Sequence, residues 1–216
     1  MDTSLYTFDI QKDLVLRLRK VVEVLRDDDT VEPDSVEFPG LAALCQHLVQ
    51  YVDHRDKLVR LYTISACMEL FAVYAPDAPW STEETLEIFR QTIRQLANLA
   101  HTTSPSNPHY ADYARILDLL AQVKIGVILV ELTKEEECKG EALPVLADLF
   151  RTLLQSVRTE HPPEIAEMIQ TTICGCFEEF HDGIMLPIPL IDELLVCIGQ
   201  GPRVLVVNPQ KAAANL

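Results

Sequence analysis

One short turn of this chain combines a carboxylate, two prolines and two aromatic rings. It consists of Tyr74, Ala75, Pro76, Asp77, Ala78, Pro79 and Trp80. Pro76 disfavours helical geometry at Ala75, and Pro79 fixes a second bend two residues after Asp77. The carboxylate on such a rigid corner can accept a charge-assisted hydrogen bond, and the prolines and aromatic rings beside it offer an apolar surface. Such a surface suits a short peptide that carries an arginine and an aromatic residue.

The same turn has a second interpretation, which the residues alone favour. Pro76 and Pro79 then only end a helix, and Trp80 fills the gap to the next helix. The burial of two side chains separates the interpretations, because an enclosed Trp80 and an inaccessible Asp77 would indicate a purely structural turn.

The other residues that could do chemistry are not spaced as a catalytic or metal site. His47 and His54 lie seven residues apart, which is wider than the usual spacing of two metal ligands on one helix. The pair in Cys174-Gly175-Cys176 lacks the two-residue gap of zinc sites. The acidic runs 27–29, 135–137 and 178–179 lack the alternating spacing of a calcium loop. No phosphate-binding loop, His-Glu-x-x-His motif or nucleophile elbow is present. We expect no catalytic, cofactor or metal site, and we interpret the six cysteines as reduced, mainly buried thiols.

The charge balance restricts the partners of the chain. Its 216 residues include 18 Lys and Arg against 33 Asp and Glu, a formal net charge of -15. This charge repels nucleic acid and resists self-association, so we expect no direct nucleic-acid binding and a monomer. The most apolar run, residues 125–130, is too short to span a bilayer, so no membrane contact is expected. The start of the chain lacks a signal-peptide pattern, so we expect an intracellular protein.

The elements that must position the turn are helices. Apolar residues recur with helical spacing over residues 10–26, 39–52, 56–74, 81–100, 109–132, 141–157, 163–181 and 188–198. The helix over residues 56–74 is apolar on most sides, so it should be buried. Ser81 and Glu84 form a capping box at the start of the next helix.

Short loops between these helices predict antiparallel hairpins. We therefore predict an all-α fold, a HEAT- or armadillo-like solenoid of helical hairpins over residues 1–216, with a compact bundle as the alternative. Asn208 and Pro209 would start a further helix that stops at Leu216, so we expect a segment of a longer solenoid.

Several segments together resemble the N-terminal HEAT repeats of the precocious dissociation of sisters family, the cohesin-associated regulators of sister chromatid cohesion. They are residues 56–60, 70–80, 88–89, 94–96, 113–124, 131–132 and 149–153. The most specific element is Ala75-Pro76-Asp77-Ala78. The resemblance covers most of the chain from Leu41 onward and is weakest after Leu186.

The resemblance implies a non-enzymatic scaffold in the nucleus, associated with chromatin. Residues 74–80 would dock a short motif of the wings-apart-like release factor, with Asp77 supplying charge and Tyr74, Pro76, Pro79 and Trp80 supplying apolar contact. Further implied partners are the kleisin subunit of cohesin, bound mainly through later repeats, and the cohesin acetyltransferase. The alternative is a structural helical-repeat segment of a cytosolic transport or assembly factor without a peptide site.

Overall fold

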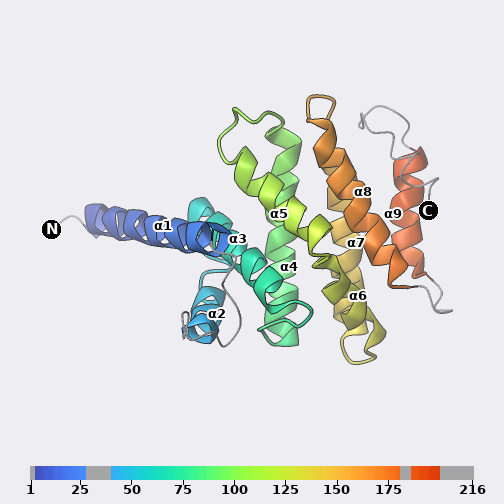
Figure 1. The fold of residues 1–216 in the computed structure, drawn as a ribbon, viewed down its shortest axis with the longest axis horizontal. Coiled ribbons are helices and arrows are strands. Elements are labelled where there is room, and N and C mark those ends of the chain that lie inside the picture. Colours follow the sequence, from blue (N-terminus) through green and yellow to red (C-terminus); the bar gives the residue numbers. More distant parts are fainter. Residues whose placement is uncertain (1–2, 28–39, 181–185, 200–216) are drawn as a thin grey trace. The chain divides into compact units, whose positions relative to one another are not determined.

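The structure, a computed structural model, describes residues 3–27, 40–180 and 186–199. Within these ranges every regular element is a helix (Figure 1). The elements are α1 (Thr3–Asp27), α2 (Leu41–Val49), α3 (Lys57–Tyr74), α4 (Thr82–Leu96), the 3₁₀ helix η1 (Ala97–His101), α5 (Tyr110–Gln122), α6 (Gly126–Lys134), α7 (Lys139–Ser156), α8 (Pro163–Glu178) and α9 (Ile188–Gly199). The predicted all-α fold is confirmed. The helix predicted after Asn208 lies outside the described residues.

The chain forms two compact units, residues 1–91 and residues 92–216. In the first unit α1 packs on α3, and the Nε atom of Arg26 pairs with Oε1 of the buried Glu69 at 2.8 Å. Helix α3 begins after Asp56, whose carboxylate accepts the backbone N–H groups of Leu58 and Val59. Twelve residues of α3 are buried, which confirms the prediction of a helix enclosed on most sides.

In the second unit α5 packs on α8, and α7 packs on α6 and α9. Figure 1 shows α6 to α9 side by side. The rings of Phe150 and Phe177 meet edge to face, with centroids 5.2 Å apart, in the core between α7 and α8. None of the helices in the described ranges has the length and apolar character that crossing a bilayer requires.

The single helix predicted over residues 109–132 is wrong, because the chain breaks between α5 and α6. Lys124 adopts a left-handed backbone conformation, with φ 57°. The stem of Lys124 lies over Gly175 of α8, where a β-carbon on residue 175 would meet it at 3.8 Å, and its Nζ atom bonds Glu178 at 3.1 Å. Gly126 follows, at a point where a β-carbon would lie only 2.9 Å from the sulfur of Cys176. The break between α5 and α6 thus coincides with contacts to α8, which lies about fifty residues later in the chain.

Candidate functional site

The candidate site is the corner between α3 and α4. Helix α3 ends at Tyr74, and Ala75 turns away with ψ 138°, as expected for a residue before proline. The backbone N–H of Asp77 donates to the carbonyl oxygen of Tyr74 at 3.1 Å and closes the turn. The Ala75–Pro76 peptide bond is cis.

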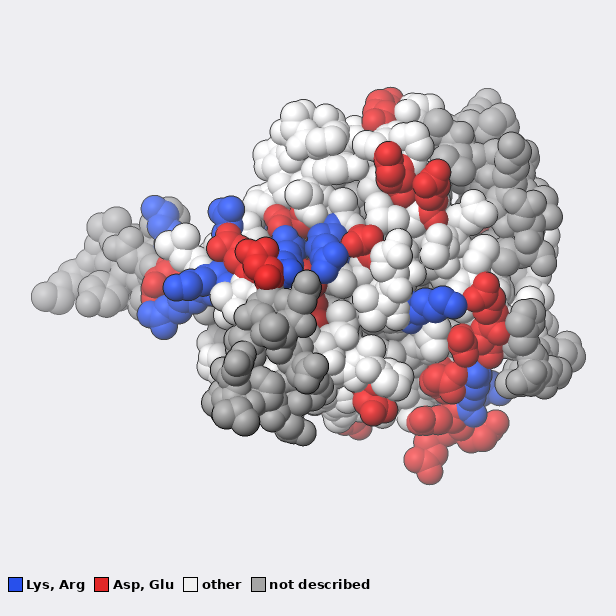
Figure 2. All heavy atoms as spheres, in the orientation of Figure 1, with Lys and Arg blue, Asp and Glu red and all other residues white. Residues whose placement is uncertain are grey.

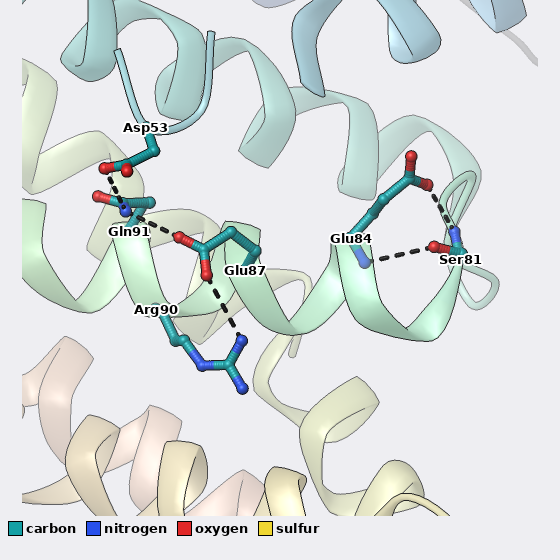
Figure 3. Close-up of polar contacts among 6 residues, drawn as sticks. All are labelled: Asp53, Ser81, Glu84, Glu87, Arg90 and Gln91. Atoms are coloured by element: carbon teal, nitrogen blue, oxygen red, sulfur yellow. Dashed lines mark hydrogen bonds and ion pairs between the residues drawn. The ribbon is translucent and has the colours of Figure 1, made fainter. Parts of the chain in front are cut away.

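The far side of the corner is fixed by the start of α4. The backbone N–H of Ser81 donates to Oε2 of Glu84 at 3.0 Å, and the N–H of Glu84 donates to the hydroxyl of Ser81 at 3.3 Å (Figure 3). These reciprocal bonds are the predicted capping box, which is confirmed. The chain therefore enters and leaves the corner through defined local geometry.

Trp80 belongs to the core beneath the corner. Only 7% of the residue is exposed, and its ring meets Phe71 edge to face with centroids 4.8 Å apart. The indole Nε1–H donates to the carbonyl oxygen of Cys45 in α2 at 3.1 Å. Trp80 therefore fills the gap beside α3, as the second interpretation of the sequence predicted, and its ring does not face solvent.

Tyr74, at the other end of the corner, is half-buried and hydrogen-bonds the thiol of Cys45. Burial raises the pKa of Cys45 to about 11, although hydrogen bonds, among them the one with Tyr74, act in the opposite direction. Both aromatic residues of the corner are thus held by one residue of α2. Sequence reasoning missed Cys45 as a partner because it lies 35 residues before Trp80 in the chain.

The exposed part of the corner is small and acidic. Ala75, Pro76 and Asp77 are exposed, whereas Ala78 and Pro79 are partly exposed. Within the described part of the chain, no side chain donates a hydrogen bond to the Asp77 carboxylate. This surface can accept a charge-assisted hydrogen bond beside a patch of proline and alanine carbons.

A polar network ties the connection before α3 to α4 (Figure 3). The side-chain amide nitrogen of the buried Gln91 donates to Asp53 at 3.0 Å and to Glu87 at 2.9 Å. Arg90 donates to the other oxygen of Glu87 at 3.4 Å. Sequence reasoning did not single out Gln91, whose only signal is a polar residue between the apolar positions of α4.

The histidines and cysteines that were considered as metal ligands or nucleophiles make local contacts or are at least partly buried. The Nδ1 atom of His54 accepts the backbone N–H of Asp56 at 3.1 Å, and His47 contacts Tyr51. Cys45, Cys67 and Cys176 are buried, whereas Cys138 and Cys174 are partly exposed. Across the described ranges, no three His, Cys, Asp or Glu side chains gather as a metal site would require. The side chain of Cys197 lies outside the described residues.

The sequence of this chain is similar to those of known proteins. The family profile "Sister chromatid cohesion protein PDS5 protein" matches residues 12–215. The homolog B-B of Xenopus laevis is 28% identical over 194 residues, which are 86% of this chain and 12% of that protein. The protein pds5 of Schizosaccharomyces pombe is 32% identical over 152 residues, which are 69% of this chain and 12% of that protein. The chain thus spans 12% of the length of these curated relatives.

A solved structure shares the fold. The structure titled "Structure of the Pds5-Scc1 complex and implications for cohesin function" matches with a TM-score of 0.70 and 20% sequence identity. The match covers 89% of this chain and 26% of that chain. It confirms the predicted HEAT-like solenoid class, and the family profile confirms the resemblance stated from the sequence. The chain belongs to the family of PDS5 sister chromatid cohesion proteins.

Proposed function

We propose that this chain is a non-enzymatic HEAT-repeat scaffold of a cohesin-associated regulator of sister chromatid cohesion, located on chromatin in the nucleus. Family membership over residues 12–215 supports the proposal, and the matched relatives are named as sister chromatid cohesion proteins. The sequence lacks the motifs of an enzyme, which agrees with a function in recruitment.

The corner of residues 74–80 docks a short motif of the wings-apart-like release factor. The observation that carries this assignment is the exposed Asp77 carboxylate on a turn fixed from both sides. An arginine of the motif pairs with Asp77, and an apolar side chain of the motif lies on Pro76 and Pro79. Trp80 supports this surface from beneath, because its own ring is buried.

The kleisin subunit of cohesin is a second proposed partner. The matched structure is titled as a complex of Pds5 with Scc1, and it extends well beyond the region shared with this chain. We assign kleisin contact mainly to later repeats of the longer proteins. The cohesin acetyltransferase is a third partner, supported only by the family resemblance.

A recovery experiment tests the docking proposal. The tagged chain is incubated with chromatin extract beside two charge-reversal variants, Asp77→Lys and Glu136→Lys, the second at an exposed acidic residue of the α6–α7 connection. Wild type and Glu136→Lys should recover the wings-apart-like protein, and Asp77→Lys should not. Equal recovery by all three proteins contradicts docking at the corner. No recovery by wild type favours a purely structural segment.

A further inference from the structure

The exposed face of α8 carries a groove in the second unit. Its volume is about 450 Å³, and it is lined by Lys124, Glu167, Gln170, Thr171, Cys174, Gly175 and Glu178. Among the described residues that line it, all except Lys124 come from α8. The groove therefore lies on one helix, with the connection between α5 and α6 beside it.

The middle and the ends of the groove differ in charge. Thr171, Cys174 and Gly175 form an uncharged middle. Carboxylates stand at both ends, since Glu167 and Glu178 are exposed. Figure 2 shows acidic side chains on the second unit's visible face, with uncharged surface between them. Such a surface complements a ligand with a positive charge at each end and small side chains between.

Lys124 carries the one cationic group among the lining residues that the structure describes. Its Nζ atom lies 3.1 Å from Oε2 of Glu178, and the two side chains are 51% and 57% exposed. An ion pair this open to water contributes little to stability. An incoming cation can therefore replace Lys124 on Glu178 at small cost.

The spacing of the carboxylates sets the spacing of the ligand charges. Glu167 and Glu178 are eleven residues apart on one helix, so their backbone positions are separated by roughly 16 Å at 1.5 Å per residue. An extended peptide advances by about 3.3 Å per residue. Alternate side chains of an extended segment point to opposite faces, so two basic residues must be an even number of positions apart to face the groove together. Four positions span roughly 13 Å, and the long basic side chains cover the remaining distance to both carboxylates.

We propose that this groove binds an extended segment of a partner protein in which two basic residues, four positions apart, flank small uncharged residues. The groove uses no residue of the 74–80 corner, so this interaction is independent of wings-apart-like docking. The partner class is a basic, extended protein segment.

Titration with a defined probe tests the groove. The probe is a fluorescent five-residue peptide with arginine at positions 1 and 5 and alanine, serine and glycine between them, and binding is followed by anisotropy at low salt. The double variant Glu167→Gln/Glu178→Gln should bind the probe roughly fivefold more weakly or worse. The control Glu136→Gln/Glu137→Gln makes the same change of charge on the α6–α7 connection and should leave the affinity unchanged. A peptide with two adjacent arginines should bind more weakly than the probe.

The Lys124→Met substitution should change the affinity for the probe in the opposite direction. Methionine keeps an unbranched stem over Gly175 but removes the charge that competes for Glu178, so the probe should bind about two- to threefold more tightly. The matched control Lys134→Met removes a cation that pairs with Glu131 and should have a smaller effect. Bound probe should also protect Cys174 from alkylation while Cys138 continues to react. Absence of binding, equal weakening by both double variants, or an unprotected Cys174 overturns the proposal.

Discussion

The indole nitrogen of Trp80 donates a hydrogen bond to the carbonyl oxygen of Cys45 at 3.1 Å. The thiol of the same Cys45 hydrogen-bonds Tyr74. One residue of α2 thus holds both aromatic ends of the corner, and the ring of Trp80 also packs on Phe71. The residues left for a partner are the exposed ones between these two aromatics, with Asp77 at their centre.

The bond between Trp80 and Cys45 should contribute to stability. The Trp80→Phe substitution keeps an aromatic ring beside Phe71 but removes the N–H donor and leaves a small void. The free energy of unfolding should fall by about 1–3 kcal/mol. Urea denaturation followed by circular dichroism measures this change. Tyr51→Phe, at a partly exposed ring, is the control and should change stability by less than about 0.5 kcal/mol. Equal stabilities for Trp80→Phe and wild type would contradict this role.

The buried thiols should resist alkylation in the folded protein. Burial raises the pKa of Cys45 to about 11 and that of Cys176 to about 12, and it also raises the pKa of Cys67. At pH 8 roughly one Cys45 in a thousand is then a thiolate, which is the reactive form. Mass spectrometry after brief iodoacetamide treatment should find Cys138 modified and these three cysteines intact until urea is added. Rapid native modification of Cys45 would show that the corner opens.

His161 should make stability depend on pH. The residue is 8% exposed, its Nδ1 atom accepts the backbone N–H of Arg158 at 3.1 Å, and its Nε2 atom bonds the carbonyl oxygen of Leu99 at 2.9 Å. Burial is the main cause that lowers the pKa of His161. The unfolded chain therefore takes up a proton at higher pH than the folded chain, since a free histidine has a pKa of about 6.5.

The stabilising effect of neutral His161 is complete above about pH 6.5 and is lost as the pH falls from there towards the lowered folded-state pKa. Urea midpoints at several pH values between 7.5 and 5 should decline more steeply for wild type than for His161→Gln. Replacing the exposed His101 by glutamine is the control and should leave the wild-type slope in place. Identical slopes for wild type and His161→Gln would show that His161 does not carry this dependence.

Local signals predicted the corner and the helices because their causes are local. Pro76 and Pro79 act on their immediate neighbours, and the capping box of Ser81 and Glu84 closes within one turn. Helix α3 was predictable since apolar residues cover nearly its whole circumference. These features need no knowledge of distant segments.

The features that sequence reasoning missed depend on distant contacts. Lys124 breaks the predicted helix over residues 109–132 without a glycine or proline at that position, and its side chain contacts α8 about fifty residues later. Trp80 faces Cys45 across 35 residues, and Gln91 faces Asp53 across 38. The sequence offered two interpretations of Trp80, and its burial agrees with the one in which the ring fills the gap beside α3. The apolar contact of the Trp80 ring with a partner belonged to the other interpretation, which the position of the ring does not support.

Titration of the wings-apart-like motif as a synthetic peptide tests the central claim most directly. Calorimetry with wild type, Asp77→Lys and Glu136→Lys should show Asp77→Lys weakened about tenfold or more, because a charge-assisted bond contributes on the order of 1.5–3 kcal/mol. Glu136→Lys should match wild type. Melting curves should show that Asp77→Lys loses less than about 1 kcal/mol of stability, because Asp77 lies on an exposed turn. Equal affinities for all three proteins, together with a destabilised Asp77→Lys, would contradict docking at the corner and leave Asp77 as an internal support of the turn.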